Sequence, residues 1–133
     1  MNGAPINERR KSYRALVVED DHATAVLVKT VLEREGFSVE AVGTGEEAIE
    51  LLKSVAYDLL IVDLILPLIR GDVVIEHLAV TQPQSVRRVI VTTASPRSLS
   101  CEILQRICRV LEKPFDIERL ILYARECMDA PAA

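Results

Sequence analysis

The sequence alternates between short apolar runs and longer amphipathic segments, and this alternation limits the possible folds more than any other feature. The apolar runs have the length and the β-branched content of buried strands, and the segments between them repeat apolar residues at helical spacing. With short connections, such an alternation predicts an α/β fold, in which helices cover both faces of a parallel sheet. The predicted strands are residues 13–18, 37–42, 57–63, 86–94 and 110–112, and the predicted helices are residues 22–36, 44–54, 72–81, 95–109 and 116–129.

Several helix boundaries carry recognisable signals. Thr44 and Glu47 have the spacing of a capping box, and Gly36 is a stop signal for the first helix. Asp21 directly precedes that first helix and is predicted to cap it. For the helix at 95–109, either Ser95 or Ser98 could be the cap.

Length and composition fit one domain with an aliphatic core. Of the 133 residues, 50% are hydrophobic but only 4% are aromatic, and a chain of this length can bury enough surface for a real core. The net charge of −4 argues against a general polyanion binder. The basic stretch "ERRKSYR" is interpreted as a solvated tail, with a nucleic-acid arm as the alternative. No signal peptide or membrane-length apolar run is visible, so we expect a cytoplasmic protein that binds neither nucleic acid nor a membrane.

The ends of the chain differ in pattern from its middle. Residues 1–12 lack periodicity and are predicted to be a flexible N-terminal tail, and residues 130–133 are predicted to be a frayed C-terminus. The domain is expected over residues 13–129. Because the sequence stops just after the last predicted helix, we expect either a stand-alone domain or one excised from a larger protein.

The three cysteines suggest neither a disulfide framework nor a zinc site, because their number is odd and no CxxC pair occurs. Cys101 and Cys108 are seven residues apart, which places them on one face of the helix predicted at 95–109. We interpret them as small buried packing residues.

Polar side chains collect where the predicted strands end. Asp63 is the one charged residue in the run "LLIVDLILP", and an ionised carboxylate is costly to bury without partners. In open α/β sheets, ligands bind outside the carboxyl ends of the strands. The residues at these ends are Glu19, Asp20 and Asp21 after the first strand, Asp63 after the third, Thr92 and Thr93 after the fourth, and Lys113 after the fifth.

These side chains form a charge set that suits a hard cation. Lys113 lowers the combined charge of Glu19, Asp20 and Asp63 from −3 to −2, which one divalent ion balances. Carboxylates without cysteine or a convincing histidine favour Mg²⁺. In the absence of the cation, repulsion among the carboxylates predicts a raised pKa for one of them.

In the order and spacing of its motifs, the chain resembles the receiver domain of two-component response regulators from Arg14 to about Asp129. The resemblance implies that residues 13–129 are a flavodoxin-like, doubly wound (βα)5 domain whose parallel five-stranded sheet has the order 2-1-3-4-5. The matching segments are "ALVVEDD", "VGTGEEAIELL", "YDLLIVDLILPLIRG", "VIVTTAS" and "VLEKPFD".

The resemblance implies an acceptor and a metal site. Asp63 is similar to the residue that takes a phosphoryl group from a phosphohistidine of a sensor histidine kinase or a histidine phosphotransfer protein. Mg²⁺ would be held by Asp20, by Glu19 through water, by Asp63 and by the backbone carbonyl of Ile65. Such a metal neutralises charge as the phosphoryl group is transferred.

The resemblance also implies a switch. Lys113 would pair with phosphoryl oxygens, and the Thr93 hydroxyl would hydrogen-bond one of them with help from the Ala94 N–H. Phosphorylation adds charge and strong acceptors, to which these groups respond. In the family, the face formed by the fourth helix, fifth strand and fifth helix contacts the downstream protein target. The resemblance also leaves open whether the domain forms a homodimer.

Some residues depart from the family pattern. Val110 stands where most receivers have Tyr or Phe, so the usual coupled motion of a hydroxyl and an aromatic ring is missing. The segment before the fifth strand is short for the family, and Ile103, Leu104 and Ile107 cannot all face inward from one narrow helical stripe. Ile65 follows the acceptor by two residues, and we hypothesise that its bulk hinders water and slows loss of the phosphoryl group.

Two other interpretations remain. A degenerate receiver would act as an interaction module without phosphorylation, and Val110 is the argument for it. A phosphatase would use Asp63 as a covalent nucleophile, but haloacid-dehalogenase-like enzymes carry a second Asp where this chain has Ile65. We therefore expect a signalling domain rather than an enzyme, one that catalyses only its own phosphorylation and dephosphorylation.

Overall fold

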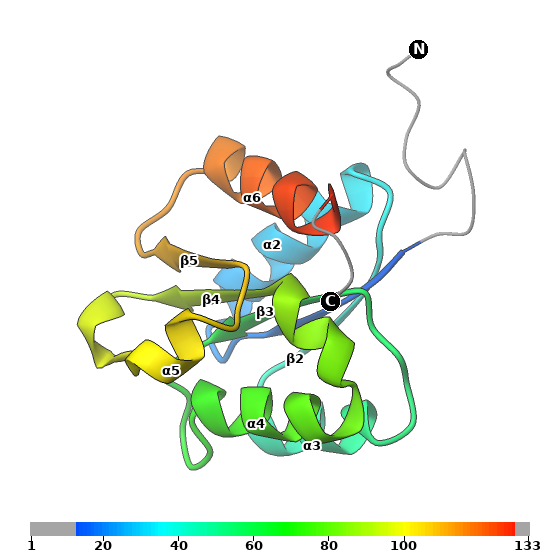
Figure 1. Cartoon of the computed structure of the whole chain (residues 1–133). Helices are drawn as coiled ribbons and strands as arrows, with labels where there is room; N and C mark the ends of the chain where they lie inside the picture. Colours follow the sequence, from blue (N-terminus) through cyan, green and yellow to red (C-terminus); the bar gives the residue numbers. More distant parts are fainter. Residues whose placement is uncertain (1–12, 130–133) are drawn as a thin grey trace.

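The computed structural model describes residues 13–129, which form a five-stranded sheet between two layers of helices (Figure 1). The strand order is β2-β1-β3-β4-β5, and all neighbouring strands are parallel. The α/β class and the strand order predicted from the sequence are both confirmed. The strands are β1 (Arg14–Val18), β2 (Ser38–Val42), β3 (Leu59–Asp63), β4 (Val89–Thr93) and β5 (Arg109–Glu112).

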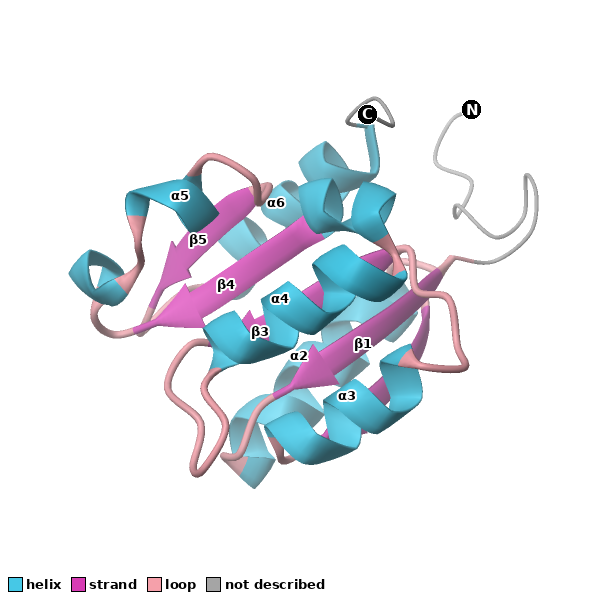
Figure 2. Cartoon of the chain, turned by 60° about the horizontal axis from the view of Figure 1, so that its bottom comes forward, coloured by secondary structure: helices cyan, strands magenta, loops and turns pink. Residues whose placement is uncertain are grey.

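The helices cover both faces of this sheet. Figure 2 shows α3 and α4 in front of the strands and α2 and α6 behind them, and α5 lies on the front face beside β5. This two-sided cover is what the alternating sequence predicts for a parallel sheet. The helices are α2 (His22–Arg34), α3 (Gly45–Leu52), α4 (Gly71–Thr81), α5 (Cys101–Leu104) and α6 (Ile117–Asp129), with 3-10 turns at Pro83–Arg88 and Pro96–Ser98.

The central strand β3 is buried along its whole length. Leu60 and Val62 pack into the apolar cluster under α3 and α4, whereas Leu59 and Ile61 pack into the cluster under α2 and α6. Alternate side chains point to opposite faces of a strand, and both faces of this strand are covered. That double burial explains why β3 is a continuous apolar run that ends in a single charged residue.

The helix caps predicted for the first two helices are present. The Thr24 N–H donates to Asp21 Oδ2 at 2.9 Å, which makes Asp21 the N-cap of α2. The Glu47 N–H donates to Thr44 Oγ1 at 3.1 Å, and Glu47 Oε1 accepts from the Gly43 N–H at 3.2 Å. These bonds satisfy N–H groups that have no partner within the helix and fix where α3 begins after β2.

The segment between β4 and β5 differs from the prediction. The long helix expected over residues 95–109 is wrong, because α5 contains only four residues. Its cap is Ser100, whose Oγ accepts from the Ile103 N–H at 3.2 Å, rather than Ser95 or Ser98. The prediction that the apolar residues of this helix cannot all face inward is confirmed, since Leu104 is 43% exposed while Ile103 is buried.

The start of β4 also differs from the prediction, which placed the strand at 86–94. Residues Pro83–Arg88 form a 3-10 turn, and the strand begins only at Val89. Val86 is nevertheless buried at 4% exposure. Val86 therefore packs into the core from a turn, and its apolar side chain does not indicate that it belongs to the strand.

The interpretation of the cysteines as unlinked packing residues is wrong. A disulfide joins Cys108 to Cys127, and Cys101 is free and exposed. The prediction assumed that one helix runs through residues 101 and 108, but α5 ends at Leu104. Cys108 therefore leads into β5 and meets α6 on the back of the sheet.

The predicted terminal segments, 1–12 and 130–133, lie outside the described residues, as does most of the basic stretch "ERRKSYR". The elements from β1 to α6 fall within the domain expected over residues 13–129. Within these described residues, no helix has the length and apolar character needed to cross a membrane.

Gly71 allows α4 to begin directly against the end of β3. Its N–H donates to the Leu64 carbonyl at 2.9 Å, and a Cβ at this position would lie 2.3 Å from the carbonyl oxygen of Asp63. We expect Gly71→Ala to lower the free energy of unfolding by roughly 2–3 kcal/mol, because backbone rather than a flexible side chain must move. Denaturant unfolding followed by circular dichroism measures this loss.

Gly43→Ala is the matched control. A Cβ at Gly43 would meet only the Glu19 carbonyl oxygen, at 3.9 Å, which is an ordinary contact. We expect a change within about 1 kcal/mol. Equal stability of the two variants would show that the close approach at Gly71 is unimportant.

Candidate functional site

The register of the sheet brings four strand ends to one edge. Val18 pairs with Val62, so that Glu19 and Asp63 follow at the same level. On the other side, Asp63 pairs with Thr92 and Thr93 pairs with Glu112, the residue before Lys113. The polar residues that the sequence places at separate strand ends therefore share one edge of the sheet, at the position where such folds bind ligands.

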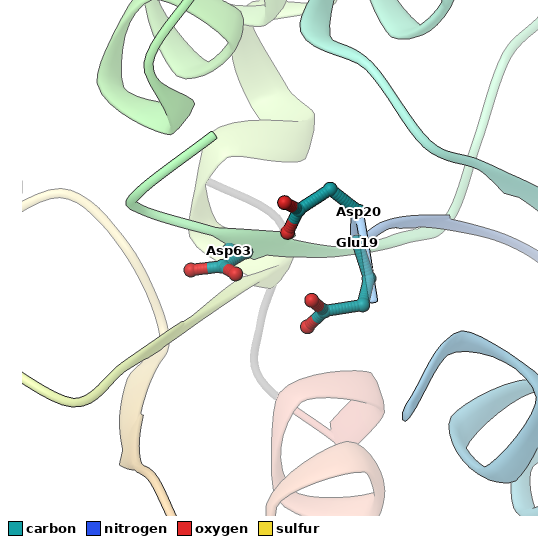
Figure 3. Close-up of side chains that lie close together, drawn as sticks. All are labelled: Glu19, Asp20 and Asp63. Atoms are coloured by element: carbon teal, nitrogen blue, oxygen red, sulfur yellow. The ribbon is translucent and has the colours of Figure 1, made fainter. Parts of the chain in front are cut away.

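Three carboxylates meet at this edge, and we call Glu19, Asp20 and Asp63 the acidic cluster. One oxygen from each lies within 4.8 Å of the others. Glu19 and Asp63 are buried, at 5% and 6% exposure, whereas Asp20 is exposed. Figure 3 shows the carboxylates of Glu19 and Asp20, from the end of β1, pointing toward the side chain of Asp63.

Lys113 neutralises part of this charge. Its Nζ donates to Glu19 Oε1 at 2.9 Å and to Asp63 Oδ2 at 3.0 Å. The lysine side chain is 25% exposed, so these bonds lie mostly out of water. Charge-assisted hydrogen bonds of this length are strong, and they explain how Asp63 can be buried at the end of an apolar strand.

The charges shift the pKa values of two members of this group. Burial raises the pKa of Glu19 above its ordinary value of 4.5, although the bonds from Lys113 and from the Asp21 N–H act in the opposite direction, and the Asp63 carboxylate raises it further. Burial lowers the pKa of Lys113, but its hydrogen bonds to Glu19 and Asp63 outweigh this and leave that pKa above 10.5. The expectation that one carboxyl has a raised pKa is confirmed for Glu19, with burial as the larger cause.

Backbone groups orient the two buried carboxylates. Asp63 Oδ1 accepts from the Ile65 N–H at 3.1 Å, while Oδ2 of the same residue accepts from Lys113. Glu19 Oε2 accepts from the Asp21 N–H at 3.1 Å. Each carboxylate thus has one backbone donor and shares the ammonium, which fixes its direction. The Ile65 side chain is 50% exposed and lies in the loop directly after Asp63.

Thr93 and Ala94 lie at the end of β4. Thr93 is fully buried, and its Oγ1 accepts from the Ser95 N–H at 3.0 Å, while its carbonyl accepts from the Lys113 N–H at 2.8 Å. Ala94 is exposed. The hydroxyl therefore belongs to the same edge as the acidic cluster, and a backbone bond ties its strand to the residue that carries the ammonium.

Sequence reasoning missed two residues that shape the loop after Asp63. Gly71 lets the chain pass close to the Asp63 carbonyl, and the glycine at the end of the loop "LPLIRG" was the available signal for it. Leu68 has φ 68° and is 90% exposed, which is unusual because leucine is disfavoured in the left-handed region. Nothing in the apolar pattern of "LILPLI" indicated this conformation.

The donor set suits a hard divalent ion. Carboxylate oxygens from Glu19, Asp20 and Asp63 approach one another closely without cysteine or histidine, which is the chemistry that Mg²⁺ prefers. The exposed Asp20 leaves the cluster open to solvent on one side. An ion could therefore enter without disturbing the buried carboxylates.

Comparison with protein-family models decides the family. The model for the response regulator receiver domain matches residues 15–125, which include all of the five strands except Arg14, the first residue of β1. The chain belongs to the response regulator receiver family. This receiver domain is a signalling domain of two-component systems with a flavodoxin-like fold, and receiver domains interact with histidine kinases and with output partners.

Curated relatives of this receiver domain include larger regulators. It is 42% identical over 69 residues to the cell cycle transcriptional regulator CtrA of Caulobacter vibrioides, covering 52% of this chain and 30% of that protein. It is 39% identical over 56 residues to YcbL of Bacillus subtilis, an uncharacterized transcriptional regulatory protein, covering 42% of this chain and 25% of that one. The matches therefore span less than a third of these relatives.

Solved receiver structures match nearly the whole domain. The non-phosphorylated HemR receiver domain of Leptospira biflexa superposes with a TM-score of 0.79 at 25% identity, covering 92% of this chain and 98% of that one. The response regulator TrrA of Thermotoga maritima, solved in complex with Mg²⁺ and BeF, has a TM-score of 0.77 at 27% identity, covering 86% and 98%. A receiver domain of the same fold thus binds Mg²⁺.

Replacing Lys113 should show how much free energy is needed to bury Glu19 and Asp63 without a charged donor. We expect Lys113→Met to lower the free energy of unfolding at pH 7 in EDTA by roughly 1–3 kcal/mol, because Glu19 and Asp63 lose a charged donor. The pKa of Glu19 is higher in the folded protein than in the unfolded chain, so binding of a proton to Glu19 stabilises the fold. This stabilisation is fully present below pH 4.5 and is lost as the pH rises through the pKa of Glu19 in the folded protein. Without the Lys113 ammonium, the pKa of Glu19 rises further. The difference in free energy of unfolding between Lys113→Met and wild type should therefore shrink as the pH falls toward 4.5. Urea unfolding across this pH range measures it.

Lys53→Met is the control for lost lysine charge. Lys53 lies 3.5 Å from Glu50, and both side chains are mostly exposed. Such surface pairs contribute little, so we expect a change below about 0.5 kcal/mol with no dependence on pH in the acid range. The role assigned to Lys113 is contradicted if its variant behaves like this control.

Proposed function

We propose that this receiver domain accepts a phosphoryl group on Asp63 from a phosphohistidine of a sensor histidine kinase or a histidine phosphotransfer protein. The observation that carries the proposal is the pairing of the Lys113 ammonium with both Asp63 and Glu19 at the edge of the sheet. An aspartate held this way is buried but has a charged donor beside it and a fixed direction, which suits a nucleophile for phosphoryl transfer. The domain catalyses only its own phosphorylation and dephosphorylation, in the cytoplasm.

Each neighbour of Asp63 has a defined task in this reaction. The Ile65 N–H and the Lys113 ammonium hold one carboxylate oxygen each, which fixes the direction of the side chain as it attacks phosphorus. The bond from phosphorus to the histidine nitrogen of the donor breaks as the bond to Asp63 forms. Lys113 then turns its charge to the phosphoryl oxygens, where negative charge collects.

Mg²⁺ fits the acidic cluster as the cofactor of this reaction. Asp20 and Asp63 would hold it directly, Glu19 through water, and the Ile65 carbonyl would complete the protein ligands. When bound, the ion neutralises charge on the transferred group. The support is the approach of the three carboxylates to within 4.8 Å in this chain, together with the Mg²⁺ complex of the Thermotoga maritima regulator.

Phosphorylation changes the charge that Thr93, Ala94 and Lys113 face. The phosphoryl group adds acceptors that draw in the Thr93 hydroxyl and the Ala94 N–H. Because the Lys113 N–H already donates to the Thr93 carbonyl at 2.8 Å, movement of one is transmitted to the other. The face of α5, β5 and α6 follows these residues and contacts the downstream protein or a second copy of the domain. The domain exchanges between two conformations, and the conformation that binds the partner more tightly gains population. The size of this shift is set by the difference between the affinities of the two conformations for the partner.

Phosphorylation can be measured with a small donor. Wild-type protein incubated with acetyl phosphate and Mg²⁺ should gain about 80 Da, the mass of one phosphoryl group, in intact-mass spectra. EDTA should prevent the adduct, because the ion is needed to neutralise charge. Asp63→Asn should form no adduct, because the amide is not nucleophilic.

Asp58→Asn is the matched control, since Asp58 precedes the same strand at its opposite end and an amide oxygen can still accept from the Arg14 N–H. It should be phosphorylated like wild type. No adduct in any protein would favour an interaction module, and rapid turnover of phosphate esters would favour a phosphatase. Either outcome contradicts the proposal.

The lifetime of the phosphorylated state should depend on Ile65. Its side chain is half exposed and follows Asp63 by two residues, and we expect it to hinder the approach of water to the phosphoryl group. We expect Ile65→Asn to lose phosphoryl label several-fold faster than wild type, because a smaller polar side chain admits and orients water. Loss of radioactive label after removal of the donor gives both rates.

Leu68→Asn makes the same chemical change later in the loop. Leu68 is 90% exposed at φ 68°, a conformation that asparagine tolerates well. Its label should decay at the wild-type rate. If both variants decay like wild type, the shielding role of Ile65 is excluded.

A further inference from the structure

The Cys108–Cys127 disulfide links the segment before β5 to α6, away from the acidic cluster. It joins the residue before β5 to the last turn of α6, with the two Cα atoms 5.9 Å apart. Cys108 is also held by the backbone, because its N–H donates to the Val89 carbonyl at 2.9 Å. The position of Cys108 at the start of the strand therefore does not depend on the disulfide.

The two sulfur-bearing residues differ in access. Cys127 is fully buried and packs with Leu120 and Ala124 under α6, whereas Cys108 is partly exposed. A reagent from solvent therefore reaches the bond from the side of Cys108. Thiol–disulfide exchange depends on such access and on which sulfur is attacked.

A positively charged pocket adjoins Cys108. It has a volume of about 430 Å³ and lies between the 3-10 turn before β4 and the segment that leads into β5. Cys108, Arg87 and Arg106 are among the residues that line it, with Gln105 as a further polar group and no Asp or Glu. The volume is that of a small-molecule site, and the arginines favour a ligand with carboxylates.

We propose that Cys108 is a site of reversible thiolation by a small anionic thiol that binds in this pocket. The proposal does not rest on phosphoryl transfer. The proposal accounts for three observations together. These are the disulfide itself, the exposure of only one of its two cysteines, and the two arginines beside that cysteine. In a reducing compartment such as the cytoplasm, which is our expectation for this chain, disulfides are mostly transient or redox-sensing.

The exchange proceeds in two balanced steps. The thiolate of the small molecule attacks Cys108 Sγ, a new S–S bond forms, and the bond to Cys127 breaks with its electron pair on Cys127, which then takes a proton from water. A second thiolate attacks the sulfur of the small molecule in this mixed disulfide. Cys108 leaves as a thiolate, the small molecule leaves as its own disulfide, and the protein has gained two electrons in total.

Opening the bond changes how α6 is attached. The helix keeps its apolar packing and two ion pairs, Arg109–Glu126 at 2.7 Å and Arg125–Glu35 at 2.8 Å. The two arginine side chains are 45% and 63% exposed, although the Glu35 side chain is only 18% exposed. Pairs that reach solvent in this way hold an element only weakly. The covalent link is therefore the strongest attachment between the end of α6 and the start of β5, and exchange removes it.

The experiment compares thiols of different charge on the native, oxidised protein. Cys101→Ser is used as the background because Cys101 is free and exposed. Glutathione, 2-mercaptoethanol and cysteamine are supplied at equal thiolate concentrations. Glutathione should form the adduct at least about threefold faster than cysteamine at low salt, with a smaller difference at high salt. Peptide mapping should find glutathione on Cys108 and an iodoacetamide label on Cys127.

Charge-removing variants identify the pocket. Arg87→Gln combined with Arg106→Gln should remove the preference for glutathione, because the lining then carries no charge. Arg97→Gln combined with Arg119→Gln removes two exposed arginines elsewhere and should keep the preference. The proposal is overturned if the oxidised protein lacks the Cys108–Cys127 disulfide, or if a thiol adduct forms only after the protein unfolds. It is also overturned if peptide mapping finds the adduct on Cys127, or if the three thiols form the adduct at equal rates.

Discussion

The site depends on one ammonium group that reaches across the sheet. Lys113 follows β5, but its two carboxylate partners lie on β3 and just after β1. The strand order places β4 between the lysine and these partners. Only a long, unbranched side chain at this level of the register can span that distance, and without it Glu19 and Asp63 would be two buried like charges. The same contact therefore ties three strands together and gives both buried carboxylates a charged partner.

The acidic cluster has a closed side and an open side. Glu19 and Asp63 are buried and bound to Lys113, while Asp20 and half of the Ile65 side chain face solvent. On the closed side, Lys113 and the Ile65 N–H set the direction of Asp63, the proposed nucleophile. In the proposed reaction, an ion and a phosphoryl donor approach from the open side, where the apolar Ile65 side chain reaches solvent. The proposal therefore assigns the orientation of Asp63 and access to it to different groups, so that a change in one need not abolish the other.

The sequence predicted the α/β class and the convergence of polar strand ends because both follow from local rules, whereas the strand order came from the resemblance to receiver domains. Buried parallel strands read as apolar runs, and their carboxyl ends must meet at one edge, so Asp63 and Lys113 were expected together despite their separation in sequence. The crossover before β5 could not be predicted in this way. Several serines there could cap a helix, and the residue types alone do not distinguish Ser100, whose Oγ accepts from the Ile103 N–H, from Ser95 and Ser98. The disulfide was missed for the same reason, since the spacing of Cys101 and Cys108 has meaning only if the helix continues between them.

The brevity of α5 affects how this domain opens from its native state. A helix of four residues has few internal hydrogen bonds, and Leu104 leaves much of its apolar surface in water. Local unfolding of such a segment requires far less free energy than unfolding of the sheet. The amide hydrogens between β4 and β5 would then exchange with solvent while those of β3 stay protected. Thr93 and Lys113 border this weakly protected stretch, so the chain between them can be reshaped without disturbing the central strands.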